Sequence, residues 1–233
     1  MVVEMHTRAQ IETYLEHYRL QDVFNEKLVP YIRLYRFGQG ELICPQGDLS
    51  ENLYVLVDGK IKIFTTSPEG RTLILSFRNP IEIIGDMEYI HGGNIINTVQ
   101  AVTPTIFLGI HYNWLNKFAD GHAPFLRFML DIITEKFYTN QHSQNFNLMY
   151  PVEVRLASYL LSVSFDETDA SFNGQLTTAE LADAANLIGT SYRHMNRVLK
   201  KFCDEGLVTR KKGLLKIINR ECLQKVATRN IYE

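Results

Sequence analysis

The chain has 233 residues, of which 45% are hydrophobic and 21% are charged, and its formal net charge at pH 7 is −2. This composition is average for a folded globular protein and excludes a largely disordered chain. Three scattered cysteines exclude a disulfide framework, and no run approaches the ~18 apolar residues of a membrane span. The N-terminus lacks a basic region followed by an apolar one, so we expect a protein of the reducing cytoplasm.

The charge is unevenly distributed along the chain. Residues 1–149 have a net charge of −4, and residues 165–189 contain five acidic side chains and no basic one. Residues 190–229 contain 11 basic and three acidic side chains, a net charge of +8. Such a basic block predicts a surface for a polyanion, although a solvated helix face would give the same count.

The first half of the chain changes from a helical pattern to a strand pattern. Segment 7–28 has apolar positions at helical spacing and predicts one or two short helices. From Ile32 to about Ile110 there are short β-branched and aromatic runs, among them LYRF, ENLYVLV, KIKIFTT, TLILSF and TIFLGI. Glycine and proline turn signals separate these runs, which predicts an antiparallel barrel, roll or sandwich. The Asp58-Gly59 step predicts a hairpin, because glycine supplies the positive φ of a tight turn.

A long helix is predicted from Pro124 to about Met149. A proline suits the first turn of a helix, where its missing N–H needs no partner. The apolar stripe of this helix would pack either on its own domain or on a second copy of the chain, and both interpretations stay open. The residues of the stripe are Phe125, Met129, Ile132, Ile133 and Phe137. A further helix is predicted after Pro151, over VEVRLASYLLSVS.

The last third of the chain predicts a helix, a tight turn, a second helix and a β-hairpin. Thr177 and Glu180 fit a capping box at the start of the first helix. Gly189 permits a sharp turn, and Ser191 suits the N-cap of the second helix. The β-prone runs LVTR and LLKII follow, joined by a basic turn. This order of elements predicts a winged helix-turn-helix.

The second of these helices is the candidate for reading duplex DNA in the major groove. Arginine donates two parallel hydrogen bonds to guanine, so Arg193 and Arg197 are favoured as base readers, and Asn196 is a candidate for adenine. Hydroxyls at helix N-termini and flexible lysines suit phosphates, as do the basic residues predicted at the hairpin tip. The predicted DNA-binding residues are Thr177, Ser191, Tyr192, Arg193, Asn196, Arg197, Lys200, Arg210, Lys211 and Lys212.

The order of these parts resembles the cyclic-AMP receptor protein/FNR (CRP/FNR) superfamily of bacterial transcription regulators. The resemblance spans nearly the whole chain. It rests on RFGQGELICPQGD at 36–48, LYVLVDGKIKI at 53–63, IGDM at 84–87 and TSYRHMNRVL at 190–199.

The resemblance implies an α+β fold with three parts. These are a cyclic-nucleotide-binding-like antiparallel β-roll over 1–123, a central dimerisation helix over 124–149 and a winged helix-turn-helix over 150–233. It also implies a homodimer that binds inverted-repeat double-stranded DNA and controls transcription, with RNA polymerase as a further partner and no membrane. The mechanism of regulation would be a change in the relative orientation of the two DNA-binding domains (the reading heads), transmitted through the central helix.

The chain departs from that family where an effector would bind. Family members that bind cyclic nucleotides have a Gly-Glu pair and, further along, an Arg-Ser pair. This chain has no Arg or Lys between Arg78 and Lys117. Because a buried phosphodiester without a cation costs several kcal/mol, we expect no regulation by cyclic AMP or GMP. The residues expected at this pocket, whose effector is unknown or absent, are Gly85, Asp86, Met87, Ile95, Ile96, Asn97 and Thr98.

Two other classes of protein are alternatives to this prediction. A β-roll can hold the metal site of a cupin-like enzyme, but the seven histidines include no HxH pair, so we expect neither a metal nor an enzyme. The other class is a cyclic-nucleotide-binding module without transcriptional activity.

The first cysteine is Cys44, so an N-terminal iron–sulfur cluster is disfavoured and no cofactor is expected. Cys44 itself is predicted to be a small buried side chain, with a redox switch as the alternative.

Overall fold

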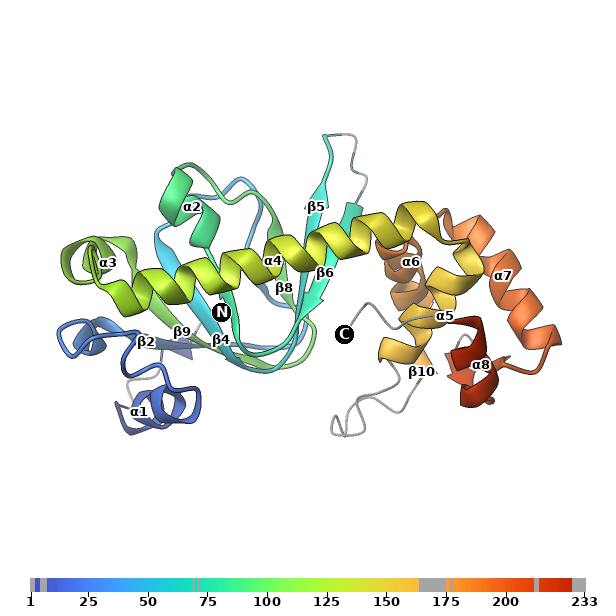
Figure 1. The fold of residues 1–233 in the computed structure, drawn as a ribbon, viewed down its shortest axis with the longest axis horizontal. Coiled ribbons are helices and arrows are strands. Elements are labelled where there is room, and N and C mark those ends of the chain that lie inside the picture. Colours follow the sequence, from blue (N-terminus) through green and yellow to red (C-terminus); the bar gives the residue numbers. More distant parts are fainter. Residues whose placement is uncertain are drawn as a thin grey trace. The chain divides into compact units, whose positions relative to one another are not determined.

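Strands dominate the first half of the chain in the computed structural model, as Figure 1 shows. The structure describes residues 3–4, 8–68, 70, 72–163, 175–176, 178–211 and 214–227. The chain forms two compact units, residues 1–136 and 137–233. The strands of the first unit are β1 (Val3–Glu4), β2 (Arg33–Phe37), β3 (Leu42–Cys44), β4 (Asn52–Asp58), β5 (Ile61–Thr66), β6 (Thr72–Arg78), β7 (Glu82–Ile84), β8 (Thr98–Ala101) and β9 (Thr105–His111).

These strands form two antiparallel sheets. One sheet has the order β1-β2-β9-β4-β7 and the other has the order β3-β8-β5-β6. All five runs that the sequence predicts as strands are strands, namely β2, β4, β5, β6 and β9. The prediction of an antiparallel β-roll is therefore confirmed.

The predicted hairpin at Asp58-Gly59 is wrong. Strand β4 pairs with β7 and β9, whereas β5 pairs with β6 and β8, so this turn connects the two sheets. The glycine itself is required, since its φ is +86° and a Cβ there would overlap the carbonyl oxygen of Pro104. The local signal identified the turn correctly, but it contains no information about which strands pair.

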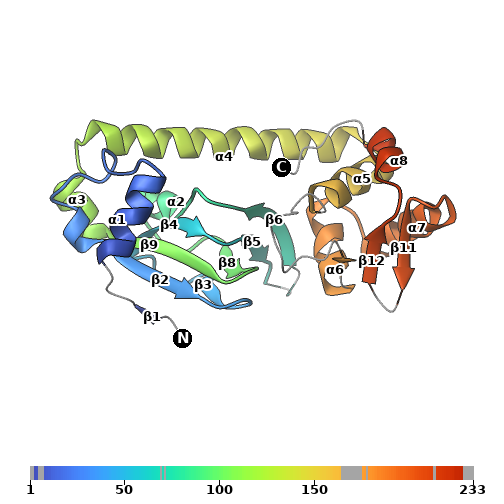
Figure 2. The ribbon, with the colours of Figure 1, turned by 90° about the horizontal axis from the view of Figure 1, so that it is seen from below.

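Alternation along the strands divides the core of this unit into two clusters. On β4, Leu53, Val55 and Val57 pack beneath the helices, whereas Leu56 packs between the sheets with Phe107 of β9. Helices α1, α2, α3 and α4 are labelled in Figure 2. The helical elements of the unit are α1 (Arg8–His17), the 3₁₀ turn η1 (Val29–Tyr31), α2 (Asp86–His91), α3 (Tyr112–Phe118) and the first part of α4 (Ala123–Met149).

Helix α4 has two apolar faces rather than the single predicted stripe. Phe125 and Met129 are buried and Ile132 is partly buried against the core of the first unit. Ile133 and Phe137 do not share that face and are 38% and 65% exposed. The apolar side chains of the exposed face are Leu126, Leu130, Ile133 and Phe137. Among the described residues, no helix combines the length and the apolarity that crossing a bilayer requires.

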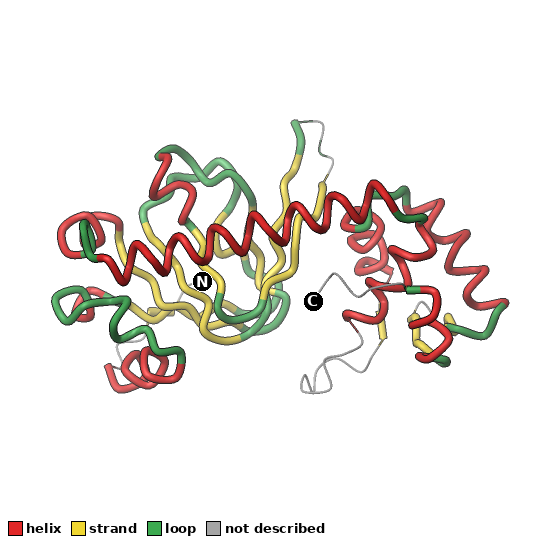
Figure 3. The backbone as a smooth tube through the Cα atoms, in the orientation of Figure 1, coloured by secondary structure: helices red, strands yellow, loops and turns green. Residues whose placement is uncertain are grey.

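The described part of the second unit has four helices besides the end of α4, and Figure 3 shows helices there with a small sheet. The helices are α5 (Val152–Val163), α6 (Thr178–Leu187), α7 (Tyr192–Asp204) and α8 (Arg220–Val226). The strands are β10 (Gln175–Leu176), β11 (Val208–Lys211) and β12 (Leu214–Ile217), in the antiparallel order β10-β12-β11. The predicted helix, turn, helix and hairpin are confirmed. Helix α8 was not expected; Asn219 caps it by accepting a hydrogen bond from the N–H of Cys222 at 3.0 Å.

Candidate nucleic-acid interface

Helix α7 begins at a side-chain cap and buries one face. Ser191 precedes the helix in an extended conformation, and its Oγ accepts a hydrogen bond from the N–H of His194 at 3.2 Å. This satisfies one of the free N–H groups at the helix start, as the sequence predicted. Met195, Leu199 and Phe202 are at most 2% exposed. The predicted apolar stripe therefore anchors the helix to its unit.

The other face of α7 is exposed and cationic. Arg193, Arg197 and Lys200 are all exposed, and they follow one another at spacings of four and three residues. Side chains at these spacings lie on one side of a helix. No hydrogen bond or ion pair joins the side chain of any of the three to another described residue. The two guanidinium groups and the ammonium group are therefore available to an external partner.

A buried arginine holds the turn between α6 and α7. Gly189 has a φ of +64°, and Arg155 of α5 donates from Nη1 to the carbonyl oxygens of Ile188 and Gly189. Asn147 of α4 donates from Nδ2 to the carbonyl oxygen of Leu187 at 3.2 Å. The carbonyl groups at a helix C-terminus lack partners within the helix and favour a cation. Arg155 and Asn147 were not identified from the sequence; the one available signal is an arginine inside the apolar helix α5.

The hairpin after α7 forms the wing. Strands β11 and β12 pair in a register that sets Lys211 opposite Leu214, and Lys211 is exposed. Lys212 at the tip of the hairpin and Thr177 before α6 lie outside the described residues. Three basic residues were predicted at the tip, namely Arg210, Lys211 and Lys212. Of these, Lys211 is the described residue that lies next to the tip.

Arg210 lies within strand β11 and is bonded to α7, the candidate recognition helix. Its Nη1 donates to Asn196 Oδ1 at 2.8 Å, and its Nη2 donates to Tyr192 Oη at 3.4 Å. Asn196 Nδ2 in turn donates to the carbonyl oxygen of Tyr192 at 3.0 Å. The pKa of the Tyr192 phenol is lowered, because hydrogen bonds from Asn196 and then from Arg210 favour the phenolate. The structure thus links three of the predicted residues to one another.

This arrangement is suited to the major groove of a duplex. The groove admits one α-helix, whose N-terminal residues reach the base edges while neighbouring groups contact the phosphates. Arg193 and Arg197 lie in the first half of α7, where base edges would be reached. Ser191 lies at the start of α7, Lys200 lies further along this helix, and Lys211 lies on the wing.

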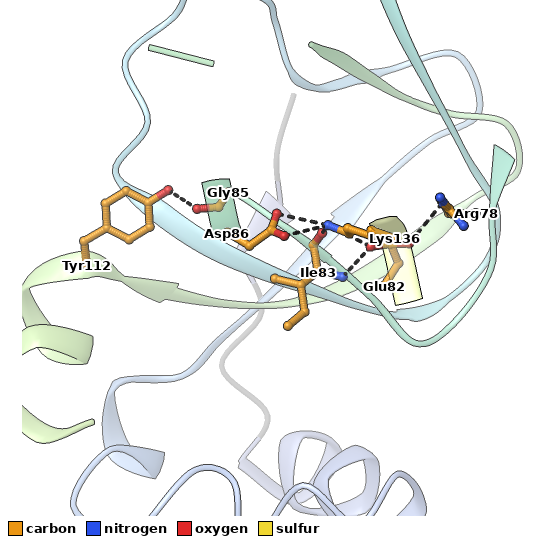
Figure 4. A network of polar contacts seen from close by, with 7 residues as sticks. All are labelled: Arg78, Glu82, Ile83, Gly85, Asp86, Tyr112 and Lys136. Carbon is orange, nitrogen blue, oxygen red and sulfur yellow. Dashed lines mark hydrogen bonds and ion pairs between the residues drawn. The ribbon is translucent and has the colours of Figure 1, made fainter. Parts of the chain in front are cut away.

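In the first unit, the expected effector residue Asp86 is paired with a lysine of α4, as Figure 4 shows. Gly85 precedes α2 with a φ of +89°, and the carboxylate of Asp86 is 2.9 Å from Lys136 Nζ. The same ammonium group is 2.9 Å from Glu82 Oε1 and donates to the carbonyl oxygen of Ile83 at 2.6 Å. Asp86 and Glu82 are 4% and 5% exposed. The carboxylate of Asp86 therefore forms an ion pair within the protein.

The other expected effector residues do not converge on one site. Met87 and Ile96 are 54% and 47% exposed, whereas Ile95 and Thr98 are buried and Asn97 is intermediate. Ile95 belongs to the cluster between the sheets. The Oγ1 of Thr98 accepts a hydrogen bond from the N–H of Gln46 at 3.1 Å.

Among the described residues, a carboxylate is bonded to the loop that the expected effector would contact. Glu88 Oε1 accepts a hydrogen bond from the N–H of Ile96 at 3.0 Å. Burial raises the pKa of Tyr112 to about 12, with the charge of Glu88 as a smaller contribution in the same direction. Burial also raises the pKa of the Cys44 thiol to about 12, and Glu88 and Asp48 add to the shift. A thiol with so high a pKa stays protonated at neutral pH and is a poor nucleophile.

The described residues contain no group of three or more His, Cys, Asp or Glu side chains that could hold a metal ion.

Two family models match the chain. The model described as "Cyclic nucleotide-binding domain" matches residues 34–122, and the model described as "Crp-like helix-turn-helix domain" matches residues 154–226. The first match runs from within β2 through β9 and α3, and the second runs from within α5 through α8 and includes both strands of the wing. The description of each model thus agrees with the fold observed in the part of the chain that it matches.

Several known proteins are similar to the chain over most of its length. Regulatory protein YeiL of Escherichia coli O157:H7 is 28% identical over 208 residues, which cover 89% of this chain and 91% of that protein. The CRP-like cAMP-activated global transcriptional regulator of Mycobacterium tuberculosis is 20% identical over 174 residues, which cover 74% and 78% of the two chains.

Solved structures share the fold. A crp/fnr-family protein from Eubacterium rectale ATCC 33656 has a TM-score of 0.77 and 18% identity, covering 93% of this chain and 100% of that one. The c-di-GMP responsive global regulator CLP of Xanthomonas campestris has a TM-score of 0.69 and 18% identity, covering 82% and 96%.

Proposed function

The chain belongs to the CRP/FNR superfamily of bacterial transcription regulators, and from this premise we propose that it is a homodimeric regulator that binds inverted-repeat DNA sequence-specifically. The observation that carries the proposal is the exposed pair Arg193 and Arg197 on a helix whose opposite face is buried. The match to the Crp-like helix-turn-helix model favours a DNA-binding regulator over the cupin-like enzyme and over a nucleotide-binding module alone.

In this proposal the predicted DNA-binding residues have two kinds of role. Arg193 and Arg197 each read a guanine through paired hydrogen bonds to O6 and N7. The remaining contacts go to phosphates, which fix the register of the protein on the duplex but read no sequence. The proposed phosphate contacts are Ser191, Lys200 and Lys211, together with Thr177 and Lys212.

The binding experiment measures the affinity of the purified chain for DNA selected from random duplexes. We expect a preferred sequence, with an affinity that falls linearly on a log–log plot by about −0.9 per phosphate contacted. Arg197→Ala is expected to cost about 1–3 kcal/mol and to relax the preference at one base pair per half-site, whereas Lys211→Ala weakens all sequences alike.

Absence of any preferred sequence over a range of salt concentrations would overturn the proposed function. An Arg197→Ala variant that keeps the wild-type base preference would overturn the role of Arg197 as a base reader. Lys211→Ala is the matched control, because it removes one cation from the same surface without removing a predicted base contact.

The exposed face of α4 supports a homodimer. Leu126, Leu130, Ile133 and Phe137 are 49%, 57%, 38% and 65% exposed, and their spacings of four, three and four residues match the seam of a two-stranded coiled coil. A contiguous exposed apolar stripe marks an interaction surface. The proposed partner for this stripe is the same stripe of a second copy, which would set two reading heads on the two halves of an inverted repeat.

In the proposed mechanism, the two DNA-binding domains of the dimer move relative to each other. The proposed domains are a sensor domain over 1–123, a dimerisation helix over 124–149 and a DNA-binding domain over 150–233. A signal would change the relative pose of the two reading heads of the dimer through the helix 124–149, and so shift the population that fits DNA. The proposed setting is the cytoplasm, with RNA polymerase as the further partner.

Cyclic nucleotides are not the proposed effectors. The loop at Ile96 gives its N–H to the Glu88 carboxylate, and no Arg or Lys occurs between Arg78 and Lys117. A phosphodiester at this loop would meet the negative charge of Glu88, and the Lys136 ammonium beside Asp86 is already paired with Asp86 and Glu82. Such a charge is unfavourable in a partly buried site.

Titration calorimetry of the full chain with cyclic AMP and cyclic GMP tests this point. We expect no saturable binding at concentrations below about 1 mM, the range of a binding free energy near −4 kcal/mol. Saturable binding at micromolar concentration would contradict the prediction and would assign the chain a cyclic-nucleotide effector.

A further inference from the structure

Three side chains join the recognition helix to the wing. Arg210 of β11 donates to Asn196 Oδ1 at 2.8 Å and to Tyr192 Oη at 3.4 Å, and Asn196 donates to the carbonyl oxygen of Tyr192 at 3.0 Å. We refer to Tyr192, Asn196 and Arg210 as the clasp. All three residues were predicted from the sequence as independent DNA contacts.

The clasp uses the groups through which Asn196 would read a base. An asparagine that recognises adenine offers its Oδ1 as acceptor and its Nδ2 as donor along one edge of the amide. Here Oδ1 accepts from a guanidinium group, a charge-assisted bond, and Nδ2 donates to a main-chain carbonyl oxygen. The protein therefore orients this amide before any DNA is bound.

Position on the helix separates Asn196 from the free arginines. Tyr192 and Asn196 are four residues apart and lie on the side of α7 that faces β11. Arg193 and Arg197 follow them by one residue each and so lie about 100° further round the helix. These two arginines are exposed, whereas Asn196 is only partly exposed. The side chains that stay available for base edges are therefore the two arginines.

Arg210 is exposed, but its guanidinium group is bonded to other residues of the same chain. It sits in the strand opposite Leu215 rather than at the tip of the wing. Both terminal nitrogens of its guanidinium group donate to residues of α7. The pKa of Tyr192 is lowered by the hydrogen bond from Asn196 first and by that from Arg210 second. In this arrangement Arg210 fixes the wing on the recognition helix.

We propose that Asn196 and Arg210 are positioning residues that hold the wing against the recognition helix, and that neither reads a base nor contacts a phosphate. The proposal rests on the proposed DNA-binding function and narrows it. Base specificity of each half-site then depends on Arg193 and Arg197, so it is a preference for guanine at two positions, with no adenine position assigned to Asn196.

The first test compares preferred sequences and affinities. Full-length wild type, Asn196→Ala, Arg210→Ala and the double variant each select duplexes from a random pool. We expect the same preferred sequence in all four, with an affinity lowered about three- to tenfold in each single variant, the size of one net hydrogen bond. The double variant is expected to lose less than the sum of the two single losses, because both substitutions break the bond between Asn196 and Arg210.

The second test measures how affinity depends on salt. Arg210→Ala is expected to leave the log–log slope unchanged, whereas the neighbouring control Lys211→Ala lowers its magnitude by about 0.9, one phosphate contact. Since a role in folding alone would not separate these two slopes, this readout is specific to the positions of the two cations.

Three results would overturn the clasp as proposed. The first is a base preference lost in Asn196→Ala, the second is additive losses in the double variant, and the third is a shallower salt slope in Arg210→Ala. Each leaves the DNA-binding function intact, because the wild-type chain would still select a sequence. If the wild type selects none, the proposed function itself fails.

Discussion

Lys136→Met is expected to lower the free energy of unfolding of the first unit by about 3 kcal/mol, the low end of the cost of breaking a buried ion pair. The ammonium group is 2.9 Å from both Asp86 and Glu82. Without it, the Asp86 carboxylate loses a cation in a site where its side chain is 5% exposed. Glu82 keeps its ion pair with Arg78 at 3.2 Å, and Lys136 is itself 21% exposed, so the full penalty is not expected.

Denaturant titration followed by the fluorescence of Trp114, the single tryptophan, measures this loss in the first unit. The matched control is Arg127→Met on the same helix. Its ion pair with Asp131 joins side chains that are 75% and 59% exposed, so a loss of less than about 1 kcal/mol is expected. Equal losses in the two variants would show that the Lys136 network does not stabilise the unit.

Leu130→Glu is expected to convert the dimer to a monomer and to lower the affinity for an inverted repeat by about 10²–10⁴-fold. Two linked reading heads bind far more tightly than one, because the second half-site is engaged within the same complex. Leu130 is 57% exposed at the middle of the apolar stripe of α4, so the substitution would repel a second copy without disturbing the core of its own unit.

Light scattering after size exclusion measures the oligomeric state, and titration of a whole and a half operator measures the two affinities. Leu49→Glu is the matched control, since Leu49 is 70% exposed and lies outside α4. We expect this control to stay dimeric. A Leu130→Glu chain that remains a dimer would overturn the proposed interface.

The strands and long helices were predictable because their signals are local. Runs of β-branched residues between turns identified β2, β4, β5, β6 and β9, and the capping residue Ser191 marked the start of α7. Helices α2, α3 and α8 were not identified, because six or seven residues are too few to establish a helical period.

Two predictions were limited by what a one-dimensional pattern contains. The Asp58-Gly59 turn was found, but its strands belong to different sheets, because pairing depends on strands far away in the sequence. The apolar residues of α4 have helical spacing on two adjacent faces. The pattern merged these faces, and burial in the structure separated them.

The amino-acid sequence by itself determined that a capped helix with one apolar and one cationic face follows a tight turn, since caps, spacing and charge all belong to neighbouring residues. Tertiary structure alone decided which partners the side chains of Asp86 and Asn196 bind. Asp86 meets Lys136 from 50 residues away, and Asn196 meets Arg210 from 14 residues away. Such bonds form where packing brings two backbone segments within hydrogen-bonding distance, which a local pattern does not encode.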